Sequence, residues 1–147
     1  MPLREELRFT NDYLDIEVVR FGPEKLRVVR ELEEASLGAM VPSILLQPLI
    51  ENSIKHGLEP RIQGGTITLR SRLEGENLII EVEDDGVGIG LKPTSGLIRS
   101  GAGIGMKLVR ERLEMIYGGA ARFMVTSRPG RGTLVSIEIP REPLGEK

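Results

Sequence analysis

The sequence contains no cysteine, no tryptophan and a single histidine, His56. Without cysteine, a disulfide framework, a thiolate zinc site and a cysteine nucleophile are all excluded. One histidine also excludes a metal site built from several imidazoles. No apolar run approaches the ~20 residues that span a bilayer. The opening residues, MPLREELRF, lack the basic-then-apolar order of a signal peptide, so we expect a cytoplasmic chain without direct membrane contact.

Positive and negative charges nearly balance: 20 Lys and Arg stand against 22 Asp and Glu, which gives a net charge of −2. This balance argues against a nucleic-acid-binding protein or an electrostatic membrane binder. The length of 147 residues, with 39% hydrophobic and 29% charged residues, is ordinary for one globular domain. What stands out is the 18 glycines, well above the usual share of about 7%.

The periodicity predicts helices and strands in an order that does not alternate strictly. Helical spacing of apolar residues predicts helices over 3–20, over 43–56, where Pro48 would kink or restart the helix, and over 104–117. Strands are expected at 26–32, 66–73, 78–84, 122–127 and 133–139. We therefore expect a two-layer α/β sandwich, with about five strands in a mostly antiparallel, mixed sheet covered on one face by three helices.

Polar residues cluster on one side of the predicted 43–56 helix. Asn52 and Lys55 lie opposite its apolar residues, and His56 lies on the border beside Asn52. Such a rim is most simply a solvated helix face. The alternative is a polyphosphate–magnesium site, in which an asparagine oxygen binds Mg²⁺ and Lys and His donate to phosphate oxygens.

A carboxylate ends the strand predicted at 78–84. Asp84 falls on the same face as the apolar residues of that strand, so it needs a partner or a pocket. Gly86 and Gly88 follow it, a pattern that also suits a simple turn. The stretch from Gly86 to Gly103 has no periodicity and is typical of a lid or binding loop.

Two further glycine patterns follow that loop. Gly101-Ala102-Gly103-Ile104-Gly105 opens a helix, where glycines let backbone N–H groups approach a phosphate, although a flexible hinge would look the same. Gly132-Thr133 starts the last strand, and Thr133 shares a face with that strand's apolar residues. Thr133 and Asp84 could therefore meet on the helix-covered side of the sheet.

Together these patterns resemble the ATP-binding fold shared by DNA gyrase, heat-shock chaperones, sensor histidine kinases and mismatch-repair proteins. Asn52-Ser53-Ile54-Lys55-His56 resembles its asparagine box, residues 84–88 and 101–105 its two glycine boxes, and Gly132-Thr133 its terminal Gly-Thr. The stretches 45–52, 105–113 and 3–7 are most similar to sensor histidine kinases of the LytS/YehU type. Met106 and Leu108 depart from that type, where Leu and Asn are expected, and the phenylalanine box of many other histidine kinases is missing.

The resemblance implies ATP and Mg²⁺ as cofactors. It implies that Asp84 accepts from the adenine amino group, that Thr133 supports the adenine, and that Asn52 binds Mg²⁺. Lys55 and His56 would contact phosphates, and Asn52 and Lys55 would be the catalytic residues. The lid would be framed by five glycines: Gly86, Gly88, Gly101, Gly103 and Gly105.

The pattern favours a kinase over a hydrolase. Hydrolysing relatives have a catalytic glutamate four residues before the box asparagine, where this chain has Pro48, and Glu51 lies roughly 100° away from Asn52 around the helix. A site that holds ATP without activating water suits phosphoryl transfer to an outside nucleophile, in which positioning of the reactants and neutralisation of the phosphate charge do most of the work. Because His56 belongs to the nucleotide box, the resemblance implies that the phosphoacceptor histidine is outside this chain.

We therefore expect residues 1–22 to form a connecting helix and 23–147 an ATP-binding catalytic domain of a two-component sensor histidine kinase. Its partners would be the phosphoacceptor dimerisation segment of the same kinase and a downstream response regulator. Two alternatives remain: an ATP-driven conformational clamp of the gyrase or chaperone kind, and a non-catalytic nucleotide sensor or protein-binding module with the same fold.

Overall fold

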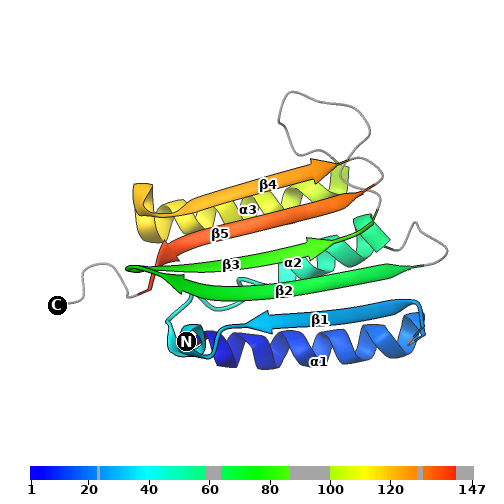
Figure 1. Cartoon of the computed structure of the whole chain (residues 1–147). Coiled ribbons are helices and arrows are strands. Elements are labelled where there is room, and N and C mark those ends of the chain that lie inside the picture. The colour runs from blue at the N-terminus through cyan, green and yellow to red at the C-terminus, as the bar shows by residue number, and fades with distance from the viewer. Residues whose placement is uncertain (23, 59–63, 87–99, 129–130, 142–147) are drawn as a thin grey trace.

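Alternating apolar residues produce one mixed sheet. The computed structural model describes residues 1–22, 24–58, 64–86, 100–128 and 131–141, and within them five strands pair in the order β1-β2-β3-β5-β4 (Figure 1). The strands are β1 (Leu26–Leu32), β2 (Gly65–Glu74), β3 (Asn77–Asp84), β4 (Arg122–Arg128) and β5 (Gly132–Pro140). β1 runs parallel to β2, and the other pairs are antiparallel. The predicted mostly antiparallel, mixed sheet is confirmed.

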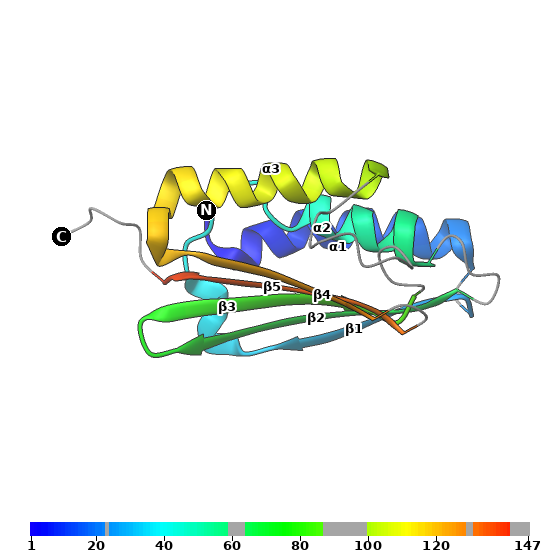
Figure 2. The ribbon, with the colours of Figure 1, turned by 90° about the horizontal axis from the view of Figure 1, so that it is seen from above.

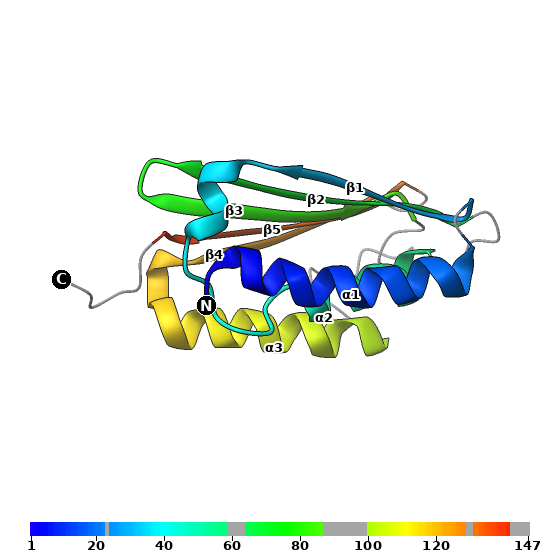
Figure 3. The same ribbon diagram turned by 90° about the horizontal axis from the view of Figure 1, so that it is seen from below.

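Three helices cover one face of this sheet, as predicted. They are α1 (Leu3–Phe21), α2 (Gln47–Asn52) and α3 (Ser100–Tyr117), and Figures 2 and 3 show them as one layer on the same side of the strands. Short turns at Glu34–Gly38 and Gly118–Ala120 join the layers. Within the described residues no helix combines the length and apolar character of a membrane span.

The hydrophobic core fills the space between the helices and the sheet. Each helix and each of the four strands nearest the core contributes to it, and among its buried side chains are Leu3, Leu7, Leu14, Leu26, Leu49, Ile50, Ile67, Leu69, Ile80, Val82, Met106, Val109, Leu113, Val135 and Ile137. Because α1 buries its leucines in this shared core, it is packed as part of the sandwich.

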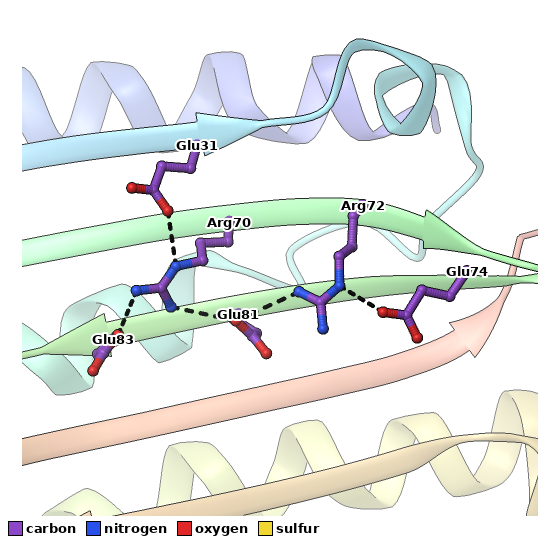
Figure 4. Close-up of polar contacts among 6 residues, drawn as sticks. All are labelled: Glu31, Arg70, Arg72, Glu74, Glu81 and Glu83. Carbon is purple, nitrogen blue, oxygen red and sulfur yellow. Dashed lines mark hydrogen bonds and ion pairs between the residues drawn. The ribbon is translucent and has the colours of Figure 1, made fainter.

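The other face of the sheet carries charges in place of a second layer. Arg70 on β2 lies among Glu31, Glu81 and Glu83 of the two neighbouring strands, with nitrogen–oxygen distances of 3.0, 3.3 and 2.6 Å (Figure 4). Arg72 extends the row toward Glu81 and Glu74 (Figure 4). Opposite charges on adjacent strands support pairing modestly, so this face is stable in contact with water.

The second helix differs most from the prediction. It begins at Gln47 instead of residue 43, with Pro48 in its first turn, where proline is tolerated because its missing N–H has no helical partner. Pro48 therefore starts the helix. From Ser53 to Leu58 the helix widens into a π-type turn, which a 3.6-residue period does not predict.

The third helix begins earlier than predicted, at Ser100 instead of Ile104. Residues 101–105 therefore belong to its first turns, and three glycines in five residues do not interrupt it. β2 and β3 form a hairpin: Glu74 pairs with Asn77, and Gly75 has a φ of +62°, a conformation that favours glycine.

We expect Leu14→Ala to lower the free energy of unfolding by about 2–5 kcal/mol, because it leaves a cavity in the shared core. Leu14 is fully buried, whereas Ile16 on the same helix is 65% exposed. Ile16→Ala is the matched control and should change stability by less than about 0.5 kcal/mol. Urea unfolding followed by circular dichroism measures both. Equal, small effects would show that α1 is not part of the core.

Candidate functional site

The site begins at the end of β3, where an apolar strand finishes in a carboxylate. Asp84 follows Leu78, Ile80 and Val82 on the inward face, and only 3% of it is exposed. It is paired with Ile67 on β2 and with Thr133 on β5. The prediction that Asp84 and Thr133 meet on the helix-covered side is confirmed, and Thr133 is also buried.

Several groups hold the Asp84 carboxylate in place. The N–H of Gly86 donates to its Oδ1 at 2.8 Å, and the hydroxyl of Ser53 forms a further hydrogen bond with it. Burial raises the pKa of Asp84 above its usual value. The bonds from Gly86 and Ser53, together with the backbone of Thr133, oppose this rise, and the neighbouring charge of Asp85 adds to it. A carboxylate can accept more bonds than these donors supply, so it retains acceptor capacity for a ligand.

Gly132 allows β5 to approach this strand end closely. Its φ is +111°, and a Cβ built on it would lie 2.0 Å from the carbonyl oxygen of Asp84. Any larger residue would have to displace the backbone that carries the carboxylate. The glycine of the predicted Gly-Thr pair thus has a steric role beside Asp84.

The second polar group of the site is Asn52, the last residue of α2. It is 8% exposed, so it does not lie on a solvated helix face. Its side-chain oxygen Oδ1 is buried and has no hydrogen-bond partner among the described residues. An unpaired buried acceptor costs free energy unless something else satisfies it, so Oδ1 is suited to a ligand or cation.

Ser53 connects the two groups. It is adjacent to Asn52 in the chain, it is 2% exposed, and it bonds to Asp84. At the other end of the π-type turn, Leu58 is fully buried against the start of β2. Because the sheet holds both ends of this turn, tertiary contacts override the helical period. Asn52 and Asp84 accordingly lie on the same, helix-covered side of the sheet.

The remaining predicted residues are placed as follows. Lys55 is exposed, and Gly86, two residues after Asp84, is buried. Gly101, Gly103 and Gly105 lie in the first turns of α3. Gly88 and the side chain of His56 lie outside the described residues, as does most of the expected lid. Met106 is fully buried in the core, whereas Leu108 is 57% exposed.

Two contributors were not given a role by the sequence reasoning. Ser53 lies within the asparagine box, but its residue type alone gave no reason to expect a bond to Asp84. Asp85, the residue after Asp84, accepts from the N–H of Thr66 at 2.8 Å. This bond fixes the start of β2 against the end of β3. The two adjacent acidic residues were visible in the sequence. Their different roles became clear only from the pairing register of β2 and β3.

A separate cavity of about 260 Å³ opens at the same end of the sheet. It is lined by Thr66, Thr68, Glu83, Asp84, Asp85 and Arg131. Thr66, Thr68 and Glu83 alternate with the inward-facing residues of their strands, which places this cavity toward the open face. Asn52 is not among its lining residues.

Comparison with known proteins gives a consistent result. Residues 42–143 match the family described as histidine kinase-, DNA gyrase B- and HSP90-like ATPases. Sensor histidine kinase BtsS of Escherichia coli K12 is 31% identical over 143 residues, which cover 95% of this chain and 24% of BtsS. Sensor protein LytS of Staphylococcus saprophyticus is 31% identical over 153 residues, covering 100% of this chain and 26% of LytS. The chain thus spans about a quarter of the length of these curated relatives.

A solved structure supports the fold independently. The catalytic domain of histidine kinase ThkA superposes with a TM-score of 0.76 over 97% of this chain and 95% of that domain, at 18% identity. At that identity the likeness shows the fold alone. ThkA has also been solved in complex with the response regulator protein TrrA.

Asp84 should make stability depend on pH. The folded chain binds a proton at Asp84 more tightly than the unfolded chain, because burial raises the pKa from its usual 3.8. Below 3.8 the carboxyl is protonated in both chains. As the pH rises from there through the raised pKa, the buried group ionises and the free energy of unfolding falls.

The comparison with Asp84→Asn isolates this effect, since asparagine does not ionise. We expect the stability of the natural chain relative to Asp84→Asn to decrease across this pH window, as measured by urea unfolding at a series of pH values. A difference that stays constant, or that grows in favour of the natural chain, would contradict the assignment.

Proposed function

From the premise that the chain belongs to the histidine kinase-, DNA gyrase B- and HSP90-like ATPase family, we propose that it binds Mg-ATP and donates the γ-phosphate to a histidine outside these 147 residues. The chain is a histidine kinase-type ATPase domain, similar to the catalytic domains of sensor kinases. The observation that carries the proposal is the buried pair of Asp84 and Asn52 on one side of the sheet.

Asp84 supplies the adenine contact in this proposal. Adenine presents an amino donor, and a carboxylate is an acceptor, so the two groups are complementary. Guanine presents a carbonyl at that position, which would face the carboxylate without a hydrogen bond. Thr133 is buried and is the residue of β5 that pairs with Asp84. It would support the adenine ring.

Asn52 fits a magnesium ion. Mg²⁺ prefers oxygen ligands and usually keeps waters and substrate phosphates around one or two protein oxygens. The buried Oδ1 of Asn52, which has no partner in the part of the chain that the structure describes, is such an oxygen. The described residues contain no cluster of three acidic or histidine side chains that could hold a metal unaided. When bound, Mg²⁺ would neutralise phosphate charge, and Asn52 would fix its place beside the nucleotide.

The phosphate contacts are assigned to the π-type turn after α2 and to the lid glycines. Lys55 is exposed one turn after Asn52, where its ammonium can reach a phosphate tail. His56 is proposed for the same role. The lid glycines, Gly86, Gly88, Gly101, Gly103 and Gly105, would allow close approach of the backbone to the phosphates.

Among the described residues of the site, neither Pro48 nor Glu51 is placed to activate water, which supports transfer over hydrolysis. Pro48 occupies the position of the hydrolytic glutamate and starts α2. Glu51 accepts a hydrogen bond from the side-chain amide of Gln47 at 3.0 Å, within the same helix. A carboxylate engaged along the helix surface is poorly placed as a general base.

The partners follow from the proposed reaction. His56, the only histidine, belongs to the nucleotide site, so the acceptor would be the phosphoacceptor dimerisation segment of a longer, cytoplasmic kinase region. Residues 1–22 would connect to that segment, and 23–147 would form the catalytic domain. A response regulator would then receive the phosphoryl group.

We expect Asp84→Asn to weaken ATP binding about 10- to 100-fold, because the amide cannot match the adenine amino group as the carboxylate does. Glu83→Gln is the matched control: Glu83 is the preceding residue, but it faces the open side and pairs with Arg70. Calorimetric titration with Mg-ATP compares the three proteins. If the natural chain binds no adenine nucleotide, or Asp84→Asn binds as well, the adenine assignment fails.

We expect Asn52→Ala to remove most of the Mg²⁺ dependence of nucleotide binding. Affinity for ATP with Mg²⁺ should fall about tenfold toward the affinity measured in EDTA, while the EDTA value should change little. Asn77→Ala, which removes a bond to Glu138 at the far end of β3, is the control. An unchanged magnesium dependence in Asn52→Ala would contradict the metal assignment.

A further inference from the structure

A buried carboxylate on α1 has all its partners outside its own helix. Glu6 is 2% exposed, and its two oxygens accept three backbone hydrogen bonds from the segment before α2. The N–H of Ile44 donates to Oε1 at 3.0 Å. The N–H groups of Leu45 and Leu46 donate to Oε2 at 2.6 and 2.8 Å. One side chain thus satisfies three consecutive donors that precede the helix.

The segment that Glu6 holds is strained. Ile44 has a φ of +55°, and among the described non-glycine residues it alone has a positive φ. A β-branched residue adopts this conformation only when its surroundings impose it. On its other side, the carbonyl of Ile44 accepts from the guanidinium of Arg112 on α3 at 3.1 Å. The N–H of Ile44 is therefore bound by α1, and its carbonyl by α3.

This segment leads directly into the helix that carries Asn52. Leu46 precedes the first helical residue and has no side-chain cap of its own. Its carbonyl accepts from the N–H of Ile50 at 3.0 Å, which starts the helical ladder. Because α2 is only six residues long, a displacement at Leu46 reaches Asn52 within two turns. Glu6 therefore holds, from a neighbouring helix, the backbone that leads into α2.

We propose that Glu6 is a positioning residue for the nucleotide site: by holding the backbone of residues 44–46, it sets where α2 presents Asn52. The consequence for nucleotide binding rests on the proposed function. The effect on Asn52 itself does not, since it concerns the chain without nucleotide. Because Glu6 belongs to α1, any displacement of α1 along its axis would be transmitted to Asn52 through these three bonds.

The alternative is that Glu6 only stabilises the fold. Burying a carboxylate with three donors satisfies the backbone, and its loss would lower stability without moving Asn52. The two roles are separated by measurements on the folded protein that stability alone does not alter. These are the side-chain amide resonances of Asn52 and the magnesium dependence of nucleotide affinity.

The test substitutes Glu6→Gln, since glutamine has one acceptor oxygen and places an N–H₂ donor against backbone donors. Glu17→Gln is the matched control: Glu17 is also a buried glutamate of α1, but it accepts hydrogen bonds from Arg20 of the same helix. We expect Glu6→Gln to shift the Asn52 side-chain amide signals and to weaken Mg-ADP binding about tenfold, with a smaller change in EDTA. Glu17→Gln should leave both unchanged.

If Glu6→Gln does not fold, Arg112→Gln releases the same segment from the α3 side and should shift the same amide signals. Unmoved Asn52 signals in the folded variants would overturn the proposal, as would equal shifts in Glu17→Gln. If the natural chain binds no Mg-ADP at all, the proposed function fails, and the amide signals still decide the role of Glu6.

Discussion

A carboxylate buried at the end of an apolar strand is the constraint on which this domain's organisation depends. Asp84 is removed from water by the helix layer, and its ionised form is correspondingly disfavoured. Three features retain it there: the N–H of Gly86, the hydroxyl of Ser53, and the close approach of β5 that only Gly132 permits. Because Ser53 adjoins Asn52, the group that holds Asp84 also sets the end of α2. The end of β3 and the end of α2 are therefore connected through the Ser53–Asp84 hydrogen bond.

Unsatisfied polarity lies at the proposed site, and backbone strain lies before the helix that leads to it. Among the described residues, Asn52 has a buried oxygen without a partner, Asp84 has a raised pKa, and Ile44 has a left-handed backbone. Each of these disfavours the folded chain, and the large core between the helices and the sheet offsets them. Glu6 and Arg112 show that α1 and α3 both contribute to holding α2. The helix layer therefore acts as a support for the site as well as a cover for the sheet.

Sequence patterns predicted much of this fold because burial follows simple periods. The strand at 26–32 was predicted with its exact ends, and the inward position of Asp84 followed from the two-residue period of β3. Pro48 pointed to a restart of the second helix, but the exact start of α2 and its π-type turn were missed. The contacts there, to Glu6 and to Asp84, are long-range. Nothing local in the sequence reports such contacts. The roles of Ser53 and Glu6 were invisible for the same reason, although the asparagine and glycine boxes themselves were recognisable.

We propose that Asp84 and Asn52 border one nucleotide site on the helix side of the sheet. The decisive experiment is a crystal structure of the domain with Mg²⁺ and a non-hydrolysable ATP analogue. We expect the adenine amino group within hydrogen-bond distance of the Asp84 carboxylate and Mg²⁺ coordinated by Oδ1 of Asn52. A nucleotide bound on the open face of the sheet, or a metal without Asn52 among its ligands, would contradict it.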